Sequence, residues 1–308
     1  MTPESSLKGE GDRYLIAAVL EGDQGAFRQL VDRYSGRLKA YAARRLGGSG
    51  IDPEDAVQEA FLGLLQGIER LSQVRSLEAY LFRILHNKIA DLTSGRPEAH
   101  GMHRVPLAGE ESSGGHHGYD PVAHEGTPSS YARRGESIES RGRVLADILE
   151  EVIGELRDEK NFRDLKVIEL LFYSSWKNRD IAGAVGLSEP TVTRIKAATL
   201  EKLSRLASKH PLGPQSFEFL EEEERASDLI RSAWSENLLS CLKRSTLGAY
   251  ALGVLEKEWS DYVAFHIETA RCETCAANLA DLKSEETPEA ARARERVFQS
   301  SVGFLKKR

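Results

Sequence analysis

The chain has 308 residues, 40% of them hydrophobic, which is enough for two or three compact units with buried cores. The longest apolar run near its start, Tyr14 to Leu20, is far shorter than the roughly 20 residues of a membrane span, and its flanks are unlike those of a secretory signal. We therefore expect a cytoplasmic protein with no membrane span, in which, at a formal net charge of −6, any attraction to nucleic acid is local.

Residues 12–96 are predicted to be helical almost throughout, because apolar residues recur there at helical spacing and no alternating run indicates a sheet. Asp52-Pro53-Glu54-Asp55 is typical of a helix start, with an Asp cap, Pro at the first helical position and acids in the first turn. The predicted core positions are Ala26, Phe27, Leu30, Val31, Tyr34, Val57, Ala60, Phe61, Leu64, Leu65, Leu77, Leu81, Ile84, Leu85, Ile89 and Leu92.

Residues 97–142 have a different composition, rich in Gly, Ser, His and Pro and without any period. Such a segment buries too little apolar surface to offset its chain entropy, so we predict a flexible linker. Five histidines lie in it, and a metal site is the alternative to a solvated linker with scattered histidines. These histidines are His100, His103, His116, His117 and His124.

Helical periodicity returns over residues 143–207, where residues 178–195 carry a helix-turn-helix pattern. Gly186 supplies the backbone freedom that the tight turn needs, Leu187 fills the angle between the helices, and Ser188 is predicted to cap the second helix. Residues 177–205 hold six basic and three acidic side chains. We predict that this helix enters a DNA major groove, the alternative being a helical hairpin with a solvated charged face. The predicted DNA-facing residues are Arg179, Ser188, Glu189, Thr191, Thr193, Arg194 and Lys196.

Residues 225–284 are predicted to form a small helical domain, followed by a short basic-ended tail, residues 285–308. All three cysteines lie in this domain, two of them as Cys272-x-x-Cys275, and together with Cys241 and His266 they make a set of four suited to tetrahedral zinc. The two alternatives are a metal-free domain with buried thiols and a Cys-x-x-Cys redox switch. Because residues six apart do not share a helix face, joint binding by His266 and Cys272 requires a turn between them.

The first and second helical segments together resemble the extracytoplasmic-function sigma factors. The resemblance covers about residues 12–96 and 143–207, and its motifs are specific as a set. It implies an all-α fold: two helical sigma domains, the second with the helix-turn-helix, joined by the linker and followed by the C-terminal domain. The motifs that carry it are Asp23-Gln24-Gly25-Ala26-Phe27, Asp52-Pro53-Glu54-Asp55-Ala56-Val57-Gln58-Glu59-Ala60-Phe61 and Tyr80-Leu81-Phe82-Arg83-Ile84-Leu85-His86-Asn87-Lys88-Ile89-Ala90-Asp91.

The resemblance implies a non-enzymatic protein that binds core RNA polymerase and promoter DNA. Asp55, Gln58 and Glu59 share one side of a helix and would meet the coiled coil of the largest polymerase subunit. The loop at residues 72–76 would take an unstacked base of the −10 element, and the helix-turn-helix would read the −35 element. The residues expected at the −10 element are Arg75, Arg83, His86, Asn87 and Lys88. The chain lacks the basic pair that usually follows the last motif.

The spacing from Cys241 to His266 resembles that of zinc-binding anti-sigma domains, although here the His-to-Cys gap is five residues rather than three. The resemblance implies that the C-terminal domain modulates the sigma domains in cis, in place of or beside a separate anti-sigma factor. Three other interpretations are open: a protein-interaction module that never touches the sigma domains, a helix-turn-helix regulator acting without polymerase, and a zinc hydrolase. The hydrolase is disfavoured because the chain has no HExxH, GxSxG or phosphate loop.

Overall fold

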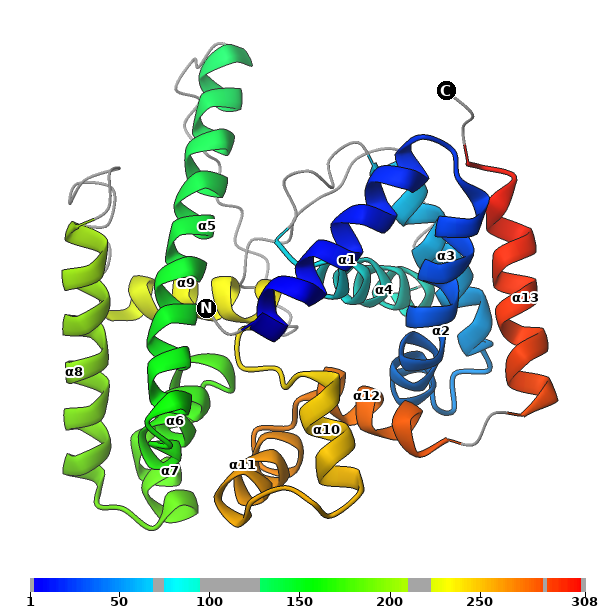
Figure 1. Ribbon diagram of the computed structural model, residues 1–308. Helices are drawn as coiled ribbons and strands as arrows, with labels where there is room; N and C mark the ends of the chain where they lie inside the picture. Colours follow the sequence, from blue (N-terminus) through cyan, green and yellow to red (C-terminus); the bar gives the residue numbers. More distant parts are fainter. Residues whose placement is uncertain (1–2, 69–74, 95–127, 210–222, 285–286, 306–308) are drawn as a thin grey trace. The chain divides into compact units, whose positions relative to one another are not determined.

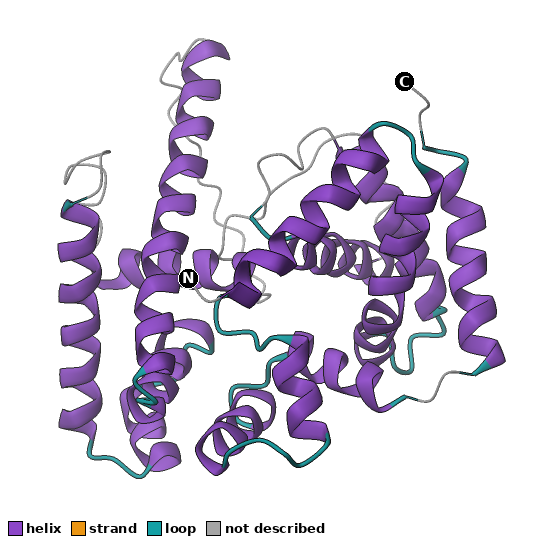
Figure 2. Cartoon of the chain, viewed as in Figure 1, coloured by secondary structure: helices purple, strands orange, loops and turns teal. Residues whose placement is uncertain are grey.

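The computed structural model describes residues 3–68, 75–94, 128–209, 223–284 and 287–305. Throughout those ranges every regular element is a helix, which confirms the predicted all-α class (Figure 2). The chain divides into two compact units, the first formed by residues 1–98 and 236–308 and the second by residues 99–235. No helix in the described ranges is long and apolar enough to cross a membrane.

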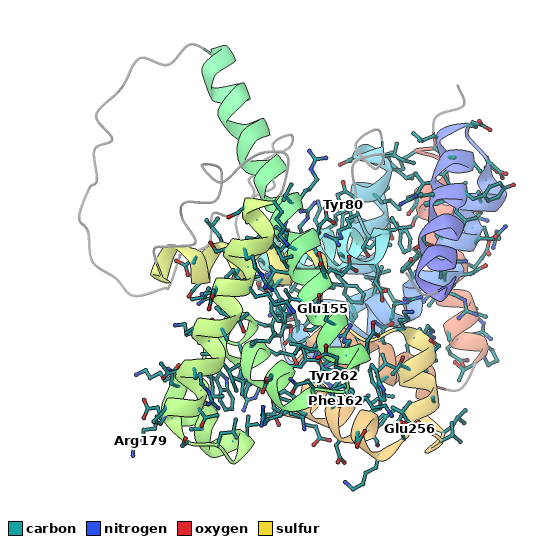
Figure 3. The ribbon with its side chains drawn as sticks, turned by 60° about the vertical axis from the view of Figure 1, so that its left-hand side comes forward. Tyr80, Glu155, Phe162, Arg179, Glu256 and Tyr262 are labelled. Atoms are coloured by element: carbon teal, nitrogen blue, oxygen red, sulfur yellow. The ribbon has the colours of Figure 1, made fainter. Side chains whose placement is uncertain are left out.

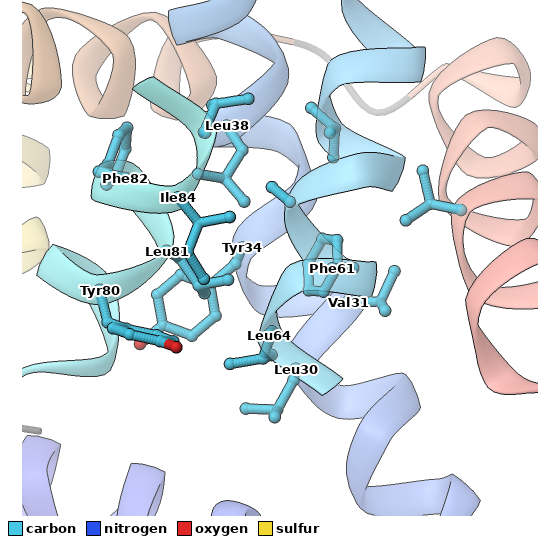
Figure 4. Packing of buried hydrophobic residues seen from close by; sticks show 14 of the residues in the cluster. Leu30, Val31, Tyr34, Leu38, Phe61, Leu64, Tyr80, Leu81, Phe82 and Ile84 are labelled. Atoms are coloured by element: carbon cyan, nitrogen blue, oxygen red, sulfur yellow. The ribbon is translucent and has the colours of Figure 1, made fainter. Parts of the chain in front are cut away.

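The first unit begins with four helices: α1 (Pro3–Leu20), α2 (Gln24–Arg45), α3 (Pro53–Gln66) and α4 (Leu77–Ser94). Their apolar faces meet in one core in which Phe27, Leu38, Phe61, Leu64 and Leu81 are fully buried (Figure 4). Helices α3 and α4 approach closely at a glycine in α3, position 63, where any Cβ would press against a side-chain methyl of α4. The helical spacing of the sequence thus predicted this core correctly, apart from the exposed Leu92.

The predicted helix start at Asp52 is confirmed. The Asp52 carboxylate accepts a hydrogen bond from the backbone N–H of Glu54 at 2.8 Å, and Pro53 occupies the first turn. Asp23 caps α2 in the same way, accepting from Gly25 N–H at 2.7 Å and Ala26 N–H at 3.1 Å. Both caps satisfy backbone donors that would otherwise be unpaired, and so they fix where the two helices begin.

Four C-terminal helices belong to the same unit: α10 (Arg244–Ala251), α11 (Lys257–Glu268), α12 (Glu273–Lys283) and α13 (Pro288–Val302) (Figure 1). Helices α10 and α11 pack on α12, α12 packs on α2, and α13 packs on α2 and α3. Residues 285–308 were predicted to be a short basic-ended tail, and most of them form the packed helix α13. Thr287 caps α13 by accepting from Ala290 N–H, and Ala293, Val297, Phe298 and Ser301 form its buried stripe.

The second unit contains α5 (Pro128–Asp158), α6 (Phe162–Ile168), a π-helical segment (Glu169–Tyr173), α7 (Asn178–Val185) and α8 (Glu189–Ser208). The unit boundary falls within α9 (Glu223–Asn237). Helix α5 begins before the predicted end of the linker, so residues 128–142 are helical. Three arginines and two glutamates lie there, and these strong helix formers extend the amphipathic segment toward its N-terminus. The five linker histidines lie outside the described residues.

Candidate functional site

Four potential metal ligands of the first unit converge on one point, as the sequence predicted. Cys241 lies between α9 and α10, His266 in the last turn of α11, and Cys272 and Cys275 at the start of α12. Their ligand atoms all lie within 4.8 Å of one another, with Sγ of Cys241 3.4 Å from Sγ of Cys272 and Nε2 of His266 3.3 Å from Sγ of Cys275.

This spacing fits a tetrahedral ion. Zn–S bonds of about 2.3 Å place two thiolates about 3.8 Å apart, close to the separations observed. His266, Cys272 and Cys275 are fully buried, and Cys241 is partly so. None of the three cysteines is in a disulfide, so each sulfur is available to bind metal as a thiolate. The four residues are thus suited to hold a closed structural zinc, which would supply cross-links between helices rather than catalysis.

The turn that the His-to-Cys spacing requires is present. Helix α11 ends at Glu268, two residues after His266, and Arg271 then adopts a left-handed conformation with φ of 56°. The N–H of Cys272 bonds to the carbonyl of His266 at 3.1 Å, which returns the chain toward the histidine. The sequence contains no glycine at this point, so the helix end was not recognisable from its residue types.

Electrostatics at the cluster favour a thiolate on α12. Hydrogen bonds from the thiols of Cys241 and Cys275, together with His266, hold the pKa of Cys272 well below its usual value. Cys272 is also the N-cap of α12, where its sulfur accepts from Cys275 N–H at 3.5 Å. The sulfur of Cys275 accepts from Leu242 N–H at 3.2 Å. Backbone donors of this kind stabilise thiolate ligands and orient them.

The opposite face of α12 contacts the N-terminal helices. Glu273 pairs with Arg45 of α2 at 2.8 Å, Ala277 lies in the main core, and the amide of Asn278 donates to Glu78 of α4 at 3.0 Å. Further along, the Asp281 carboxylate lies against α2 at position 36, where a Cβ would displace it. Helix α12 therefore provides Cys272 and Cys275 to the cluster at its start, and its other side packs on α2.

Helix α13 covers a second face of the N-terminal helices. The ring of Phe298 lies 6.0 Å from that of Phe27, and the guanidinium of Arg28 lies 3.9 Å above it. Arg28 also pairs with Glu295 at 2.6 Å. At the start of α3, the guanidinium of Arg296 bonds to the Glu54 carboxylate. The C-terminal segment is thus built into the core of the first unit, which excludes a module that never touches these helices.

The three residues predicted to bind polymerase lie on α3 next to this contact. Asp55 is exposed, whereas Gln58 and Glu59 are half-buried. Glu59 pairs with Lys88 of α4 at 3.2 Å, and both side chains keep about a third of their surface exposed. The sequence predicts a DNA contact for Lys88, so the structure joins two residues that the sequence assigns to different partners.

The residues predicted to face the −10 element occupy one side of α4 and the position before it. Arg83 and His86 are exposed, Asn87 and Lys88 are half-buried, and Arg75 is half-buried ahead of the helix. Most of the predicted base-binding loop, residues 72–74, lies outside the described residues. His86 has two partners: Nδ1 lies 2.6 Å from an Arg45 nitrogen and 3.2 Å from the Tyr41 hydroxyl. No motif in the sequence pointed to Arg45.

A guanidinium can only donate, so Nδ1 of His86 accepts from Arg45 and the ring carries its proton on Nε2. The surrounding protein partly desolvates the ring of His86 although the residue reaches the surface, and this desolvation, followed by the neighbouring Arg45 charge, lowers the pKa of His86, which agrees with a neutral ring. Burial raises the pKa of Tyr41 to about 12, so its hydroxyl remains a donor at neutral pH.

In the second unit the helix-turn-helix forms as predicted. Gly186 ends α7 in a left-handed conformation with φ of 71°, and Val192, Ile195 and Leu203 hold α8 on the core. The prediction that Ser188 caps α8 was wrong in detail. Ser188 occupies the cap position, but its hydroxyl bonds to that of Thr191 at 2.8 Å instead of a backbone N–H.

The predicted DNA-facing residues are mostly at the surface of this unit. Arg179, Ser188, Glu189, Thr193 and Arg194 are exposed, and Thr191 and Lys196 are half-buried. Figure 3 shows Arg179 at the outer edge of its unit with the side chain directed away from the ribbon. The two helices are tied together where the Asn178 amide donates to the Thr193 hydroxyl at 3.1 Å.

Comparison with known proteins finds matches for part of the first unit. Residues 30–96, which include α3, α4 and most of α2, match the family model of sigma-70 region 2. We call residues 30–96 region 2 after that family model. The chain is similar to the RNA polymerase sigma factor CnrH of Cupriavidus metallidurans, with 39% identity over 92 residues, 30% of this chain and 45% of the relative.

Two further relatives match in the same way. The RNA polymerase sigma factor NccH of Alcaligenes xylosoxydans xylosoxydans is 37% identical over 89 residues, 29% of this chain and 47% of the relative. The ECF RNA polymerase sigma factor SigD of Mycobacterium bovis is 26% identical over 112 residues, 34% of this chain and 53% of the relative. The chain thus spans about half the length of these relatives. No solved structure matches it.

Proposed function

We propose that this protein is a sigma factor of the extracytoplasmic-function class, which binds core RNA polymerase and directs transcription initiation at specific promoters. The observation that carries the proposal is region 2, whose α3 presents Asp55, Gln58 and Glu59 and whose α4 presents Arg83 and His86. Asp55, Gln58 and Glu59 would bind polymerase, and the exposed side of α4 would contact the −10 strand. Helix α8 in the second unit would read the −35 element through Thr193, Arg194 and their neighbours.

The cluster of three cysteines and a histidine is proposed to hold zinc. A closed Cys3His set supplies folding energy by joining segments that have few other contacts. Here the ion would join the residue before α10, the end of α11 and the start of α12. Because α12 also packs on α2 through Ala277 and Glu273, the ion would stabilise the face that contacts region 2.

We further propose that the C-terminal helices modulate region 2 in cis. Helices α12 and α13 contact α2 and α3, and Arg296 bonds to Glu54, the residue next to Asp55. Asp55 itself remains exposed, so the first contact with polymerase does not require the C-terminal helices to leave. A separate anti-sigma factor is not needed for such regulation.

Binding of the full chain to purified core RNA polymerase tests the proposal. Asp55→Arg places a positive charge on the predicted polymerase face, whereas Glu21→Arg makes the same charge change at an exposed position after α1. We expect wild type and Glu21→Arg to elute with core polymerase in gel filtration and Asp55→Arg to elute alone. If wild type binds duplex DNA tightly but never core polymerase, the protein is instead a helix-turn-helix regulator.

A further inference from the structure

Two arginines at the surface of region 2 lie against aromatic rings of its core. The guanidinium of Arg45 lies 5.5 Å from the ring centre of Tyr41, and that of Arg83 lies 5.4 Å from the ring centre of Tyr80. His86 joins the group through its hydrogen bonds to Arg45 and Tyr41. Tyr41 and Tyr80 are buried, so their rings hold the guanidinium groups in place, and Arg45, Arg83 and His86 are the exposed members of the group. Arginine side chains held at a surface bind the backbone phosphates of nucleic acids. We call Arg45, Arg83 and His86 the cationic surface.

The two arginines of the cationic surface already have anionic partners from the C-terminal segment. Glu273, at the start of α12, accepts from Nε of Arg45 at 2.8 Å. Glu236 lies 3.8 Å from Arg83. Each of these four side chains keeps between 32% and 45% of its surface exposed, so the pairs lie within reach of solvent and of a competing anion.

A carboxylate and a phosphate offer the same kind of acceptor to a guanidinium. Both present two oxygens that accept parallel N–H bonds, and arginine binds either one with the same edge. Glu273 therefore occupies the Nε–H donor of Arg45, which a phosphate would otherwise use. The two ion pairs differ from the apolar contacts of α12 and α13, because they join partly exposed charged side chains on the side of region 2 that contains Arg83 and His86.

We propose that the cationic surface, with Arg45 as an additional contact residue, binds the phosphates of single-stranded DNA, and that Glu236 and Glu273 hold its arginines in the free protein. DNA and the two carboxylates then compete for the same cations. The inference rests on the proposed function for its biological meaning, since a −10 strand would be the natural ligand. The competition itself does not involve polymerase, because DNA phosphates only replace Glu236 and Glu273 as partners of the arginines.

The test measures binding of the full chain to a fluorescently labelled single-stranded oligonucleotide of mixed sequence, by anisotropy at fixed salt. The double variant Glu236→Gln/Glu273→Gln keeps side-chain size and removes both charges. We expect its affinity to rise about threefold to tenfold, as two partly exposed ion pairs cease to compete. Adding Arg45→Ala to the double variant should cancel most of the increase.

Glu268→Gln is the matched control, because Glu268 is an exposed carboxylate at the end of α11 in the same C-terminal segment. Circular dichroism and thermal unfolding establish that each variant folds as wild type does. An unchanged affinity in the folded double variant overturns the proposal. So does an equal increase in Glu268→Gln, or an increase that persists without Arg45. None of these results depends on whether the protein binds polymerase, so the two proposals can fail separately.

Discussion

Substitution of Phe298 by alanine tests whether α13 is an integral part of the first unit. Phe298 is 7% exposed, and its ring lies 6.0 Å from the fully buried Phe27. Truncation of a buried phenylalanine costs about 3–5 kcal/mol, and the lower end applies here because the ring lies where α13 meets α2 rather than at the centre of the core. We expect a loss of about 3 kcal/mol in the free energy that holds α13 in place.

Such a loss raises the population of undocked α13 about a hundredfold. Hydrogen exchange measured by mass spectrometry should show faster exchange in α13 and in the adjacent turns of α2, and slow exchange in α8 should persist. Arg292→Ala is the control, because the Arg292 side chain is 70% exposed on the outer face of the same helix. If Phe298→Ala changes neither exchange nor urea stability by more than Arg292→Ala does, α13 does not dock as described.

Three further predictions concern the cluster of three cysteines and a histidine, His86 of α4, and α8. Purified protein should contain about one zinc ion per chain by mass spectrometry, and Cys275→Ser should lose the ion and lower the midpoint of thermal unfolding; equal metal content in both contradicts the site. Because the pKa of His86 is lowered in the fold, the unfolded chain protonates first, so stability should fall as the pH drops from about 6.5 through the folded pKa. His86→Gln should flatten that part of the stability curve, and an unchanged slope contradicts the assignment. Arg194→Ala should weaken binding of the full chain to its duplex site by about 1–3 kcal/mol, measured by anisotropy, whereas a loss that is equal for all sequences would assign Arg194 to phosphate.

The sequence predicted well those features that depend on local spacing. Periodicity identified the core faces of α2, α3, α4 and α8, and Asp52-Pro53 identified the start of α3, because caps and apolar stripes are set by neighbouring residues. The sequence identified the four residues of the cluster because they include every cysteine of the chain. The spacing between His266 and Cys272 required a turn before Cys272. No residue type indicated that Arg271 would adopt a left-handed backbone conformation there.

Features that depend on what an apolar face packs against were missed. The sequence contains the signals of α13, because Thr287-Pro288 is a helix cap and Val297 and Phe298 lie on one apolar face. Residues 285–308 were nevertheless predicted to be a tail. A stripe gives the face of a helix but not its partner, so the sequence did not show that Phe298 covers Phe27. Arg45 was missed for a related reason. It is an exposed arginine in the last turn of α2, and only the fold brings it to His86.

Transcription by core RNA polymerase on fragmented genomic DNA, with and without the purified full chain, is the most direct test of the proposed function. Mapping the 5′ ends of the transcripts locates the start sites whatever the promoter sequence is. We predict new start sites that appear only with the protein and that share two upstream sequence elements, and we predict their loss with Asp55→Arg but not with Glu21→Arg. A set of 5′ ends identical to that of core polymerase alone would contradict the assignment of a sigma factor.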